Sequence, residues 1–289
     1  MAEILDLMDR VNPNEPWYEQ LSRYKQLLLW DGDVPGFDTT LGQPKPSVTM
    51  FKAPGGAGKG CVIVMAGGGY SFKSTGEGVN ICRRLNIDGI NAALLDYRMI
   101  PYPKNTILAD AKRCVRYLRC HAEELEINPG KIGVMGFSAG GNLAASTCFE
   151  GDDGDPDSPD PVERFSCRPD AAVLAYAAVV LVEEEEEDDG EFDLFKYFNY
   201  KPTGDMRFPP AFIWQSFEDM LISYKSTFSL VELLRKKKVP VELHIFPYGE
   251  HGQNLADRIK YEKPEESSFD ALTIAWSGLC TRWLKYYGF

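Results

Sequence analysis

From residue 59 onward, short apolar runs rich in β-branched residues alternate with longer amphipathic stretches. This alternation is typical of parallel strands joined by crossover helices. The runs are almost wholly apolar, as expected when helices cover both faces of a sheet. The sequence therefore predicts an α/β fold with a mostly parallel central sheet and helices on both faces. The predicted strands are 61–66, 91–96, 131–136, 170–176, 211–217 and 240–246, and the predicted helices are 76–88, 106–125, 138–149, 223–238 and 264–287.

The first 60 residues do not follow this alternation. They mix proline, glycine and aromatic residues, and one strand is predicted in them, at 47–52. We expect an N-terminal extension, 1–60, that packs on the same domain. A length of 289 residues is near the upper limit for one hydrophobic core, so residues 1–289 are predicted to form a single domain.

Two acidic stretches, at 150–160 and 183–189, interrupt the pattern and are predicted to be solvated loops. The second contains five glutamates and two aspartates, follows a predicted strand, and belongs to an insertion that we place at 183–193. A block of like charges is usually a self-repelling surface segment. We favour a surface loop over the alternative, a lid that covers a site.

Acidic side chains outnumber basic ones, 43 to 31, which gives a formal net charge of −12. Such a charge repels phosphate backbones and anionic lipid surfaces, so neither nucleic acid nor a membrane is an expected partner. Acidic residues interrupt the first 11 positions where a signal peptide would need an apolar core. The apolar runs are also shorter than the roughly 20 residues that span a bilayer. We expect a cytoplasmic protein, and a homo-oligomer is left open.

The cysteines and histidines do not predict a metal site. The seven cysteines are scattered without a Cys-x-x-Cys pair, and the three histidines have no metal-ligand spacing. Reduced thiols and no metal are therefore expected.

Ser138 stands at the centre of Gly-Phe-Ser-Ala-Gly, residues 136–140. An apolar strand is predicted before it, and a run of small, helix-compatible residues follows. In this context Gly-x-Ser-x-Gly becomes a nucleophile elbow, a strained turn in which larger side chains than glycine would collide. The pentad alone arises by chance about 0.1 times per chain of this composition, so the context carries the prediction that Ser138 is a nucleophile.

Three consecutive glycines, 67–69, directly follow the predicted strand 61–66. Bare backbone amides can approach a ligand closely at such a loop. The N–H groups of Gly68 and Gly69, together with that of Ala139, are predicted to form an oxyanion hole. Tyr70, which follows the glycines, is a candidate substrate-binding residue.

Dinucleotide binding is a rival interpretation of the glycine loop, because Asp96 ends the next strand as a ribose-binding acid would. Phe72, however, occupies the position of the third glycine of that fingerprint. The glycines at 55–60 lack the first glycine and the Ser or Thr of a phosphate loop, so a turn is predicted there. No organic cofactor is expected.

A serine hydroxyl needs an adjacent base to attack at neutral pH. His251 is well placed for this role, since it is flanked by glycines in the loop after the predicted strand 240–246. His244 lies inside that strand and His121 near the end of a helix, so both are expected to have structural or surface roles.

The carboxylate that orients the histidine should come from the loop after the preceding strand. Asp219 is our choice in that loop, and Glu218 is the alternative. The chain order Ser138, Asp219, His251 is the order typical of the nucleophile-elbow hydrolases.

With these residues the chain resembles the acetylxylan-esterase-like branch of the α/β-hydrolases, often called xylanase-B-like proteins. The similar segments are 29–36, 67–70, 95–98, 132–141, 210–214, 219–222 and 239–246. The family typically has an aliphatic residue three positions after the catalytic aspartate, and Ile222 fits Asp219 in this way. Ala66 and Ala177 depart from the family pattern, as does the acidic run. The resemblance implies removal of acetyl or other short acyl groups from carbohydrates.

The function expected is that of a serine esterase that acts on short-chain acetyl esters, on carbohydrates such as acetylated xylo-oligosaccharides, by a Ser-His-Asp acyl-enzyme mechanism. The expected partner is therefore a small-molecule ester. A short-chain carboxylesterase of broad range and a formamidase-like amidase are the alternatives. A non-catalytic binding protein on a hydrolase scaffold and a nicotinamide enzyme are more remote.

Overall fold

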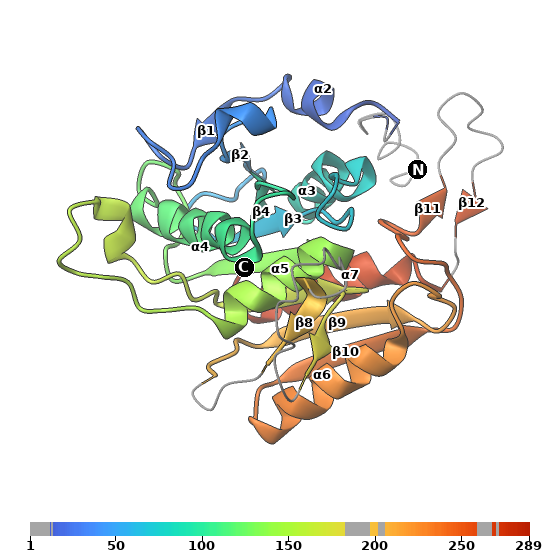
Figure 1. The fold of residues 1–289 in the computed structure, drawn as a ribbon. Helices are drawn as coiled ribbons and strands as arrows, with labels where there is room; N and C mark the ends of the chain where they lie inside the picture. Colours follow the sequence, from blue (N-terminus) through green and yellow to red (C-terminus); the bar gives the residue numbers. More distant parts are fainter. Residues whose placement is uncertain (1–11, 13, 183–196, 202–205, 259–267, 270–271) are drawn as a thin grey trace.

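The structure is a computed structural model that describes residues 12, 14–182, 197–201, 206–258, 268–269 and 272–289. Its central feature is an eight-stranded sheet with strand order β1-β2-β4-β3-β5-β6-β9-β10. Strands β4, β3, β5, β6, β9 and β10 are parallel to one another, whereas β2 is antiparallel to both of its neighbours, β1 and β4 (Figure 1). The strands are β1 Gln26–Leu28, β2 Ser47–Phe51, β3 Cys61–Met65, β4 Asn91–Asp96, β5 Ile132–Phe137, β6 Ala171–Ala175, β9 Ala211–Ser216 and β10 Val241–Phe246.

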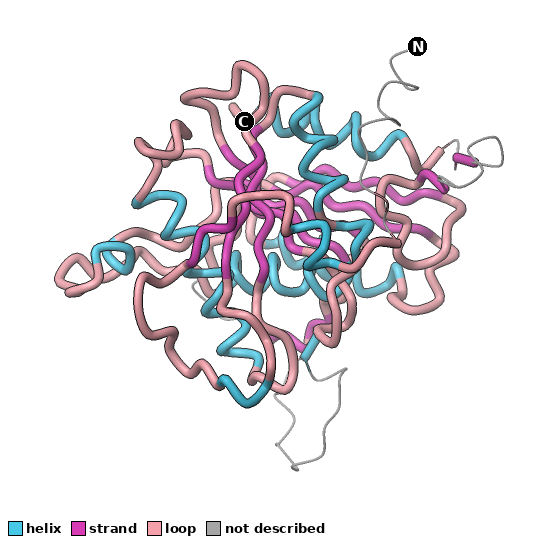
Figure 2. Tube along the Cα trace, turned by 90° about the horizontal axis from the view of Figure 1, so that it is seen from above, coloured by secondary structure: helices cyan, strands magenta, loops and turns pink. Residues whose placement is uncertain are grey.

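Helices cover both faces of this sheet and enclose two separate cores. In Figure 2 the strands run through the middle of the molecule and the helices lie around them. Helices α4, α5 and α6 contribute to one core, and α2, α3 and α7 contribute to the other. The helices are α2 Trp17–Leu21, α3 Val79–Ile87, α4 Lys104–Cys120, α5 Ser138–Phe149, α6 Tyr224–Lys236 and α7 Ala275–Tyr286. Short 3-10 turns lie at η1 Thr39–Leu41, η2 Thr75–Glu77 and η3 Pro161–Arg164.

The apolar runs of the sequence reflect this two-sided burial. Successive strand residues point to opposite faces, so Ile63 of β3 joins one core while Val62 and Val64 join the other. Every residue of β3, β4, β5, β6 and β9 is buried, whereas β10 at the edge is only half-buried. The predicted α/β fold is confirmed.

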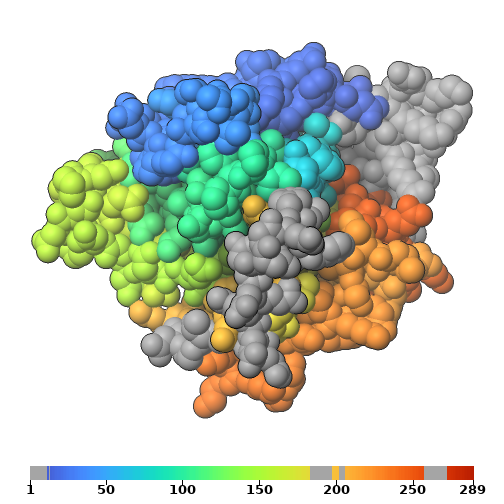
Figure 3. All heavy atoms as spheres, viewed as in Figure 1, coloured from blue at the N-terminus to red at the C-terminus, as the bar shows by residue number. Residues whose placement is uncertain are grey.

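The first 60 residues add two strands to the same sheet. Strands β1 and β2 extend it beyond β4, and Trp17 of α2 packs into the core that contains α3. In the space-filling view the described part of this segment (blue) lies at the opposite end of the molecule from α6 (Figure 3). The predicted strand at 47–52 corresponds to β2; β1 and α2 were not predicted, because they are too short to show a clear period.

The helix predicted at 264–287 is wrong in its first part. Helix α7 begins at Ala275, and the backbone of Ser268 and Phe269 pairs instead as strand β12 with β11, Asp257–Arg258. Backbone groups used in a strand ladder cannot close helical turns at the same time, so the helix begins later.

The acidic stretch 150–160 is only partly the solvated loop that we predicted. The carboxylates of Asp152 and Asp160 form ion pairs with Arg116 and Arg113 of α4. The acidic insertion at 183–193 lies outside the described residues. On either side of it, β7 (Val180–Leu181) and β8 (Asn199–Tyr200) form a small parallel sheet. Among the described helices, none has both the length and the apolar composition required to cross a membrane.

Candidate active site

Ser138 sits at the junction where β5 passes directly into α5. Its φ of 52° lies in the left-handed region, which side-chain-bearing residues rarely adopt and which marks strain in the turn. A Cβ atom on Gly136 would lie 2.1 Å from the carbonyl oxygen of Gly140, and one on Gly140 would lie 2.1 Å from that of Met65. The pentad therefore needs glycine at both positions, as the elbow interpretation requires.

The structure brings the three predicted catalytic side chains into one hydrogen-bonded line. His251 Nε2 lies 2.8 Å from Ser138 Oγ, and His251 Nδ1 lies 2.7 Å from Asp219 Oδ2. Ser138 directly follows β5, and Asp219 and His251 lie in the loops that follow β9 and β10. The parallel course of these strands places their carboxyl ends at one edge of the sheet. We call this edge the carboxyl edge.

The surroundings of Asp219 fix its carboxylate. The backbone N–H groups of Leu221 and Ile222 both donate to Asp219 Oδ1, at 2.9 and 2.8 Å, which leaves Oδ2 for His251. The Asp219 side chain is 1% exposed, and that of His251 is 18% exposed. A buried carboxylate with all its donors in place can hold the imidazole in a single orientation.

Glu218, the alternative acid, lies elsewhere. Its Oε2 accepts a hydrogen bond of 3.1 Å from the backbone N–H of Gly249, and the Ser216 hydroxyl donates to the Gly249 carbonyl. Both contacts hold the loop that carries His251. The geometry therefore favours Asp219 over Glu218 as the partner of the imidazole.

The other two histidines have separate partners. His244 Nε2 lies 2.9 Å from Glu242 on the edge strand, and His121 Nδ1 lies 3.4 Å from Glu124. Neither contacts the serine, which agrees with the structural or surface roles predicted for them.

The glycine loop lies beside the nucleophile. A Cβ on Gly67 would lie 2.9 Å from that of Ser138, and Gly68 has a φ of 117° that favours glycine. Within the described residues, the N–H groups of Gly68, Gly69 and Ala139 donate to no protein acceptor. Ala139 is also the second residue of α5, where unpaired N–H groups and the helix dipole favour negative charge.

This fold is shared with known hydrolases. The acetyl ester-xyloside bifunctional hydrolase from Caldicellulosiruptor lactoaceticus is 33% identical in sequence, with a TM-score of 0.76; the match covers 91% of this chain and 96% of that one. The chain belongs to the acetylxylan-esterase-like family of α/β-hydrolases. In addition, the BD-FAE family model matches residues 51–190.

Two curated relatives of this acetylxylan-esterase-like chain are considerably longer. Endo-1,4-beta-xylanase B of Butyrivibrio fibrisolvens is 30% identical over 211 residues, which cover 68% of this chain and 33% of the relative. The acetylxylan esterase of Xylanibacter ruminicola is 26% identical over 215 residues, 69% of this chain and 42% of the relative. The chain therefore matches about a third to two fifths of their length.

We predicted that Tyr70 binds substrate, but its side chain is buried in the core. It is 1% exposed, and its hydroxyl donates to Asn142 Oδ1 at 2.8 Å. The left-handed backbone at Tyr70, with a φ of 58°, directs the side chain into the core. Burial raises the pKa of the Tyr70 hydroxyl well above its usual value. Tyr70 therefore anchors the glycine loop rather than binding substrate.

A buried carboxylate that the sequence analysis did not single out lies behind the glycine loop. Glu77 is 2% exposed; the N–H of Gly67 donates to its Oε2 at 2.6 Å, and the Tyr176 hydroxyl donates to its Oε1 at 2.7 Å. Burial raises the pKa of Glu77, while hydrogen bonds from Tyr176 and Gly67 oppose this rise. The sequence does contain a signal for this residue: Glu77 stands between two glycines, and glycine is disfavoured in the interior of a helix.

A second buried carboxylate holds the other end of the loop. Lys73 Nζ lies 2.7 Å from Asp96 Oδ1, with the two side chains 2% and 3% exposed, and Trp17 Nε1 donates to the same oxygen. Tyr97 donates to the carbonyl of Ala66, just before the glycines. Asp96, which was considered above as a ribose-binding acid, is thus enclosed by protein groups.

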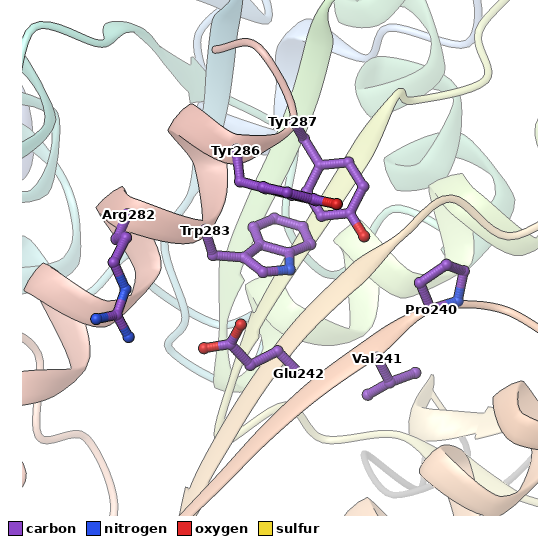
Figure 4. A pocket seen from close by; sticks show the side chains of 7 residues that line it. All are labelled: Pro240, Val241, Glu242, Arg282, Trp283, Tyr286 and Tyr287. Atoms are coloured by element: carbon purple, nitrogen blue, oxygen red, sulfur yellow. The ribbon is translucent and has the colours of Figure 1, made fainter.

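No cluster of three or more potential metal ligands occurs among the residues that the structure describes. A groove of about 410 Å³ does occur, but it lies between α7 and the start of β10. Figure 4 shows the rings of Trp283, Tyr286 and Tyr287 gathered there, with Glu242 near them and Arg282 apart. Because β10 runs from this groove toward the loop that carries His251, the groove and that loop are separated by about 17 Å along the strand.

Proposed function

We propose that the protein is a carboxylic ester hydrolase that works through an acyl-enzyme on Ser138. The observation that carries this proposal is the hydrogen-bonded line from Ser138 through His251 to Asp219, beside backbone N–H groups that donate to no acceptor in the described part of the chain. The neighbouring donors matter because a nucleophile and base alone would leave the negative charge of the intermediate unstabilised.

The reaction takes place in two steps. In the first, Ser138 Oγ attacks the ester carbonyl carbon while His251 Nε2 accepts the hydroxyl proton. The resulting oxyanion receives hydrogen bonds from the N–H groups of Gly68, Gly69 and Ala139. When the tetrahedral intermediate collapses, the C–O bond breaks, His251 returns the proton to the leaving alcohol, and an acyl-serine remains.

In the second step water replaces the alcohol. His251 accepts a proton from the water as its oxygen attacks the acyl carbon, and then returns the proton to Ser138 Oγ as the acid leaves. Asp219 stays ionised throughout and stabilises the imidazolium that forms in each step. This chemistry requires no metal or organic cofactor.

We further propose that the substrates are short acyl esters, acetyl above all, carried by carbohydrates such as xylo-oligosaccharides. Support comes from the relatives, whose names include an acetyl ester-xyloside hydrolase and an acetylxylan esterase.

A carboxylesterase of broader range is the second candidate, and one feature favours it. Large apolar side chains next to the triad in sequence are exposed: Met220 is 94% exposed, Leu221 60% and Tyr248 58%. Such a rim could accept apolar alcohols as readily as sugars.

The experiment that tests the esterase uses purified protein with p-nitrophenyl acetate, alongside S138A. We expect hydrolysis by the wild type and a loss of about 10⁴-fold or more in kcat for S138A, with an unchanged circular dichroism spectrum. Hydrolysis that survives S138A, or none by the wild type across a panel of short acyl esters, would remove the proposal.

Acetylated xylo-oligosaccharides and aryl acetates, compared by kcat/KM, separate the two substrate classes. A higher kcat/KM for the sugar esters supports the carbohydrate assignment. Equal or lower values leave the broad carboxylesterase.

A further inference from the structure

Three loops of the carboxyl edge converge on one buried side chain. Glu77 follows the glycine loop, and its Oε2 accepts the backbone N–H of Gly67 at 2.6 Å. Its Oε1 accepts the hydroxyl of Tyr176, which follows β6, at 2.7 Å. The Tyr176 oxygen in turn accepts the N–H of Asn254, in the loop that carries His251, at 3.1 Å. A single carboxylate thus connects the loop expected to bind the oxyanion with the loop that carries the base.

The hydrogen-bond directions along this chain are fixed by chemistry. The N–H groups of Asn254 and Gly67 can only donate, so the Tyr176 hydroxyl must use its own proton toward Glu77. Glu77 therefore faces donors at both oxygens, a pattern that suits the ionised form. Burial opposes ionisation and raises the pKa of Glu77, and these donors counter part of that rise.

His251 lies against this network. The ring of Tyr176 meets the imidazole edge-on, with centroids 5.1 Å apart and planes at 72°. The charge of Glu77 and that of a protonated His251 attract each other. The other charged or titratable groups that face the two are Asp219 on the imidazole, and Tyr176 and Tyr97 around Glu77.

We propose that Glu77 is a positioning residue that holds the oxyanion loop and the His251 loop in register, with its charge favouring the imidazolium formed during acyl transfer. This inference rests on the proposed function, because it assigns Glu77 a role in the same site. Asp219 touches the imidazole directly, whereas Glu77 acts through Gly67 and Tyr176.

The decisive variant is E77Q, which keeps the shape of the side chain and removes the charge. Its amide keeps an acceptor at only one of the two oxygen positions, so either Gly67 or Tyr176 loses its acceptor and one loop loses its anchor. We expect kcat for p-nitrophenyl acetate to fall by about 10²-fold, since misplacement of reacting groups by about 1 Å has effects of that size. KM should change much less.

The pH profile separates charge from shape. Activity requires neutral His251, and a nearby negative charge stabilises the protonated form. Removing that charge in E77Q should move the acidic limb of kcat/KM to lower pH, by about half a unit or more. E77D, which keeps the charge but shortens the reach, should lower kcat and leave the acidic limb in place. Y176F should also lower kcat. Because it removes a donor that lowers the pKa of Glu77, it weakens the negative charge as well, so any shift of its acidic limb should have the same direction as in E77Q. The double variant E77Q/Y176F should be little worse than E77Q.

D110N is the matched control, because it shows what loss of a buried carboxylate does when that carboxylate has only a structural role. Asp110 is also a fully buried carboxylate, but it is bound by Arg98 and contacts neither loop of the site. D110N should lower thermal stability without moving the acidic limb. If E77Q also leaves the limb unmoved and its loss of kcat follows its loss of stability, Glu77 is only a structural residue and the proposal fails.

A readout without substrate keeps this test independent of the esterase assignment. The chain has three histidines, so the imidazole NMR signals of His251 can be identified by comparison with H251N. The midpoint of the His251 titration should fall in E77Q and stay unchanged in D110N. An unchanged midpoint in E77Q contradicts the charge coupling even if turnover is normal. A shifted midpoint in a protein without esterase activity upholds the coupling and rejects the proposed function instead.

Discussion

Two groups of carboxylates in this molecule are held in opposite ways. At the carboxyl edge, Asp219 and Glu77 are almost completely buried and accept hydrogen bonds from backbone N–H groups, a tyrosine and a histidine. Along α4, Asp152 and Asp160 are partly exposed and pair with lysine and arginine side chains.

The two kinds of surroundings shift carboxylate pKa values in opposite directions, as Glu77, Asp152 and Asp160 show. Burial raises the pKa of Glu77. Burial has the same tendency at Asp152 and Asp160, but the cations of α4 and backbone N–H groups outweigh it and lower both pKa values. Cations neutralise a carboxylate and fasten a loop, whereas neutral donors keep its charge available to a neighbouring imidazole. We therefore propose that the first group serves catalysis and the second serves stability.

The largest loss of kcat is expected from a substitution in the loop after β9, which carries both Glu218 and Asp219. D219N should lower kcat by about 10⁴-fold, since an amide favours the wrong tautomer of the imidazole. E218Q changes a neighbouring acid whose side chain accepts a hydrogen bond from the backbone N–H of Gly249, and it should lower kcat by less than about tenfold. Both are measured with p-nitrophenyl acetate at saturation. Similar losses in the two variants would remove the distinction between Asp219 and Glu218.

The glycine loop that Glu77 holds gives the next largest effect. G68A should lower kcat by about 10²-fold to 10³-fold, because a Cβ there would lie 2.2 Å from the carbonyl oxygen of Phe72 and displace an oxyanion donor. Gly55 is a matched control: its φ is also positive, at 67°, but a Cβ meets nothing within 4 Å. G55A should cost about 1 kcal/mol of stability and leave kcat unchanged. Equal kcat in G68A and wild type would contradict the role of this loop.

The parts of the site that could be predicted from sequence are those with a local signature. Ser138 follows from a pentad whose glycines are sterically required, and His251 and Asp219 follow from loops after consecutive strands. The strands themselves were readable because burial on both faces makes each of them a continuous apolar run.

The remaining parts depend on contacts between distant residues. Glu77 and Tyr176 are 99 positions apart, and nothing near either of them indicates their hydrogen bond. Tyr70 was misplaced because its orientation depends on a left-handed φ that no pattern of polarity records. The start of α7 was missed because the backbone of 268–269 pairs with another segment.

The two carboxylates that pair with cations of α4, Asp152 and Asp160, should affect stability and leave catalysis unchanged. Asp152 has a lowered pKa in the folded protein, so its stabilisation is present above the unfolded value of about 4 and is lost as the pH falls below that value. Because the side chain is 45% exposed, solvent screening limits the effect, and D152N should lower Tm at pH 7 by only about 2–4 °C.

Urea unfolding of wild type and D152N between pH 7 and pH 3.5 measures this contribution. The difference in stability should shrink at the acidic end, while kcat at pH 7 stays the same. A difference that persists or grows as the pH falls, or a large loss of kcat, would show that the two groups of carboxylates are not separate in function.

The smallest effect is expected at the groove between α7 and the start of β10. Tyr286 is 83% exposed there and lies at the amino end of β10, away from the triad. Y286A should leave kcat/KM for p-nitrophenyl acetate within about twofold of wild type and change Tm by no more than about 1 °C, as for most exposed side chains. A tenfold loss with this small ester would mean that the groove is coupled to the carboxyl edge. A loss confined to acetylated xylo-oligosaccharides would instead make the ring a contact for the sugar chain, because only a long substrate could reach both ends of the strand.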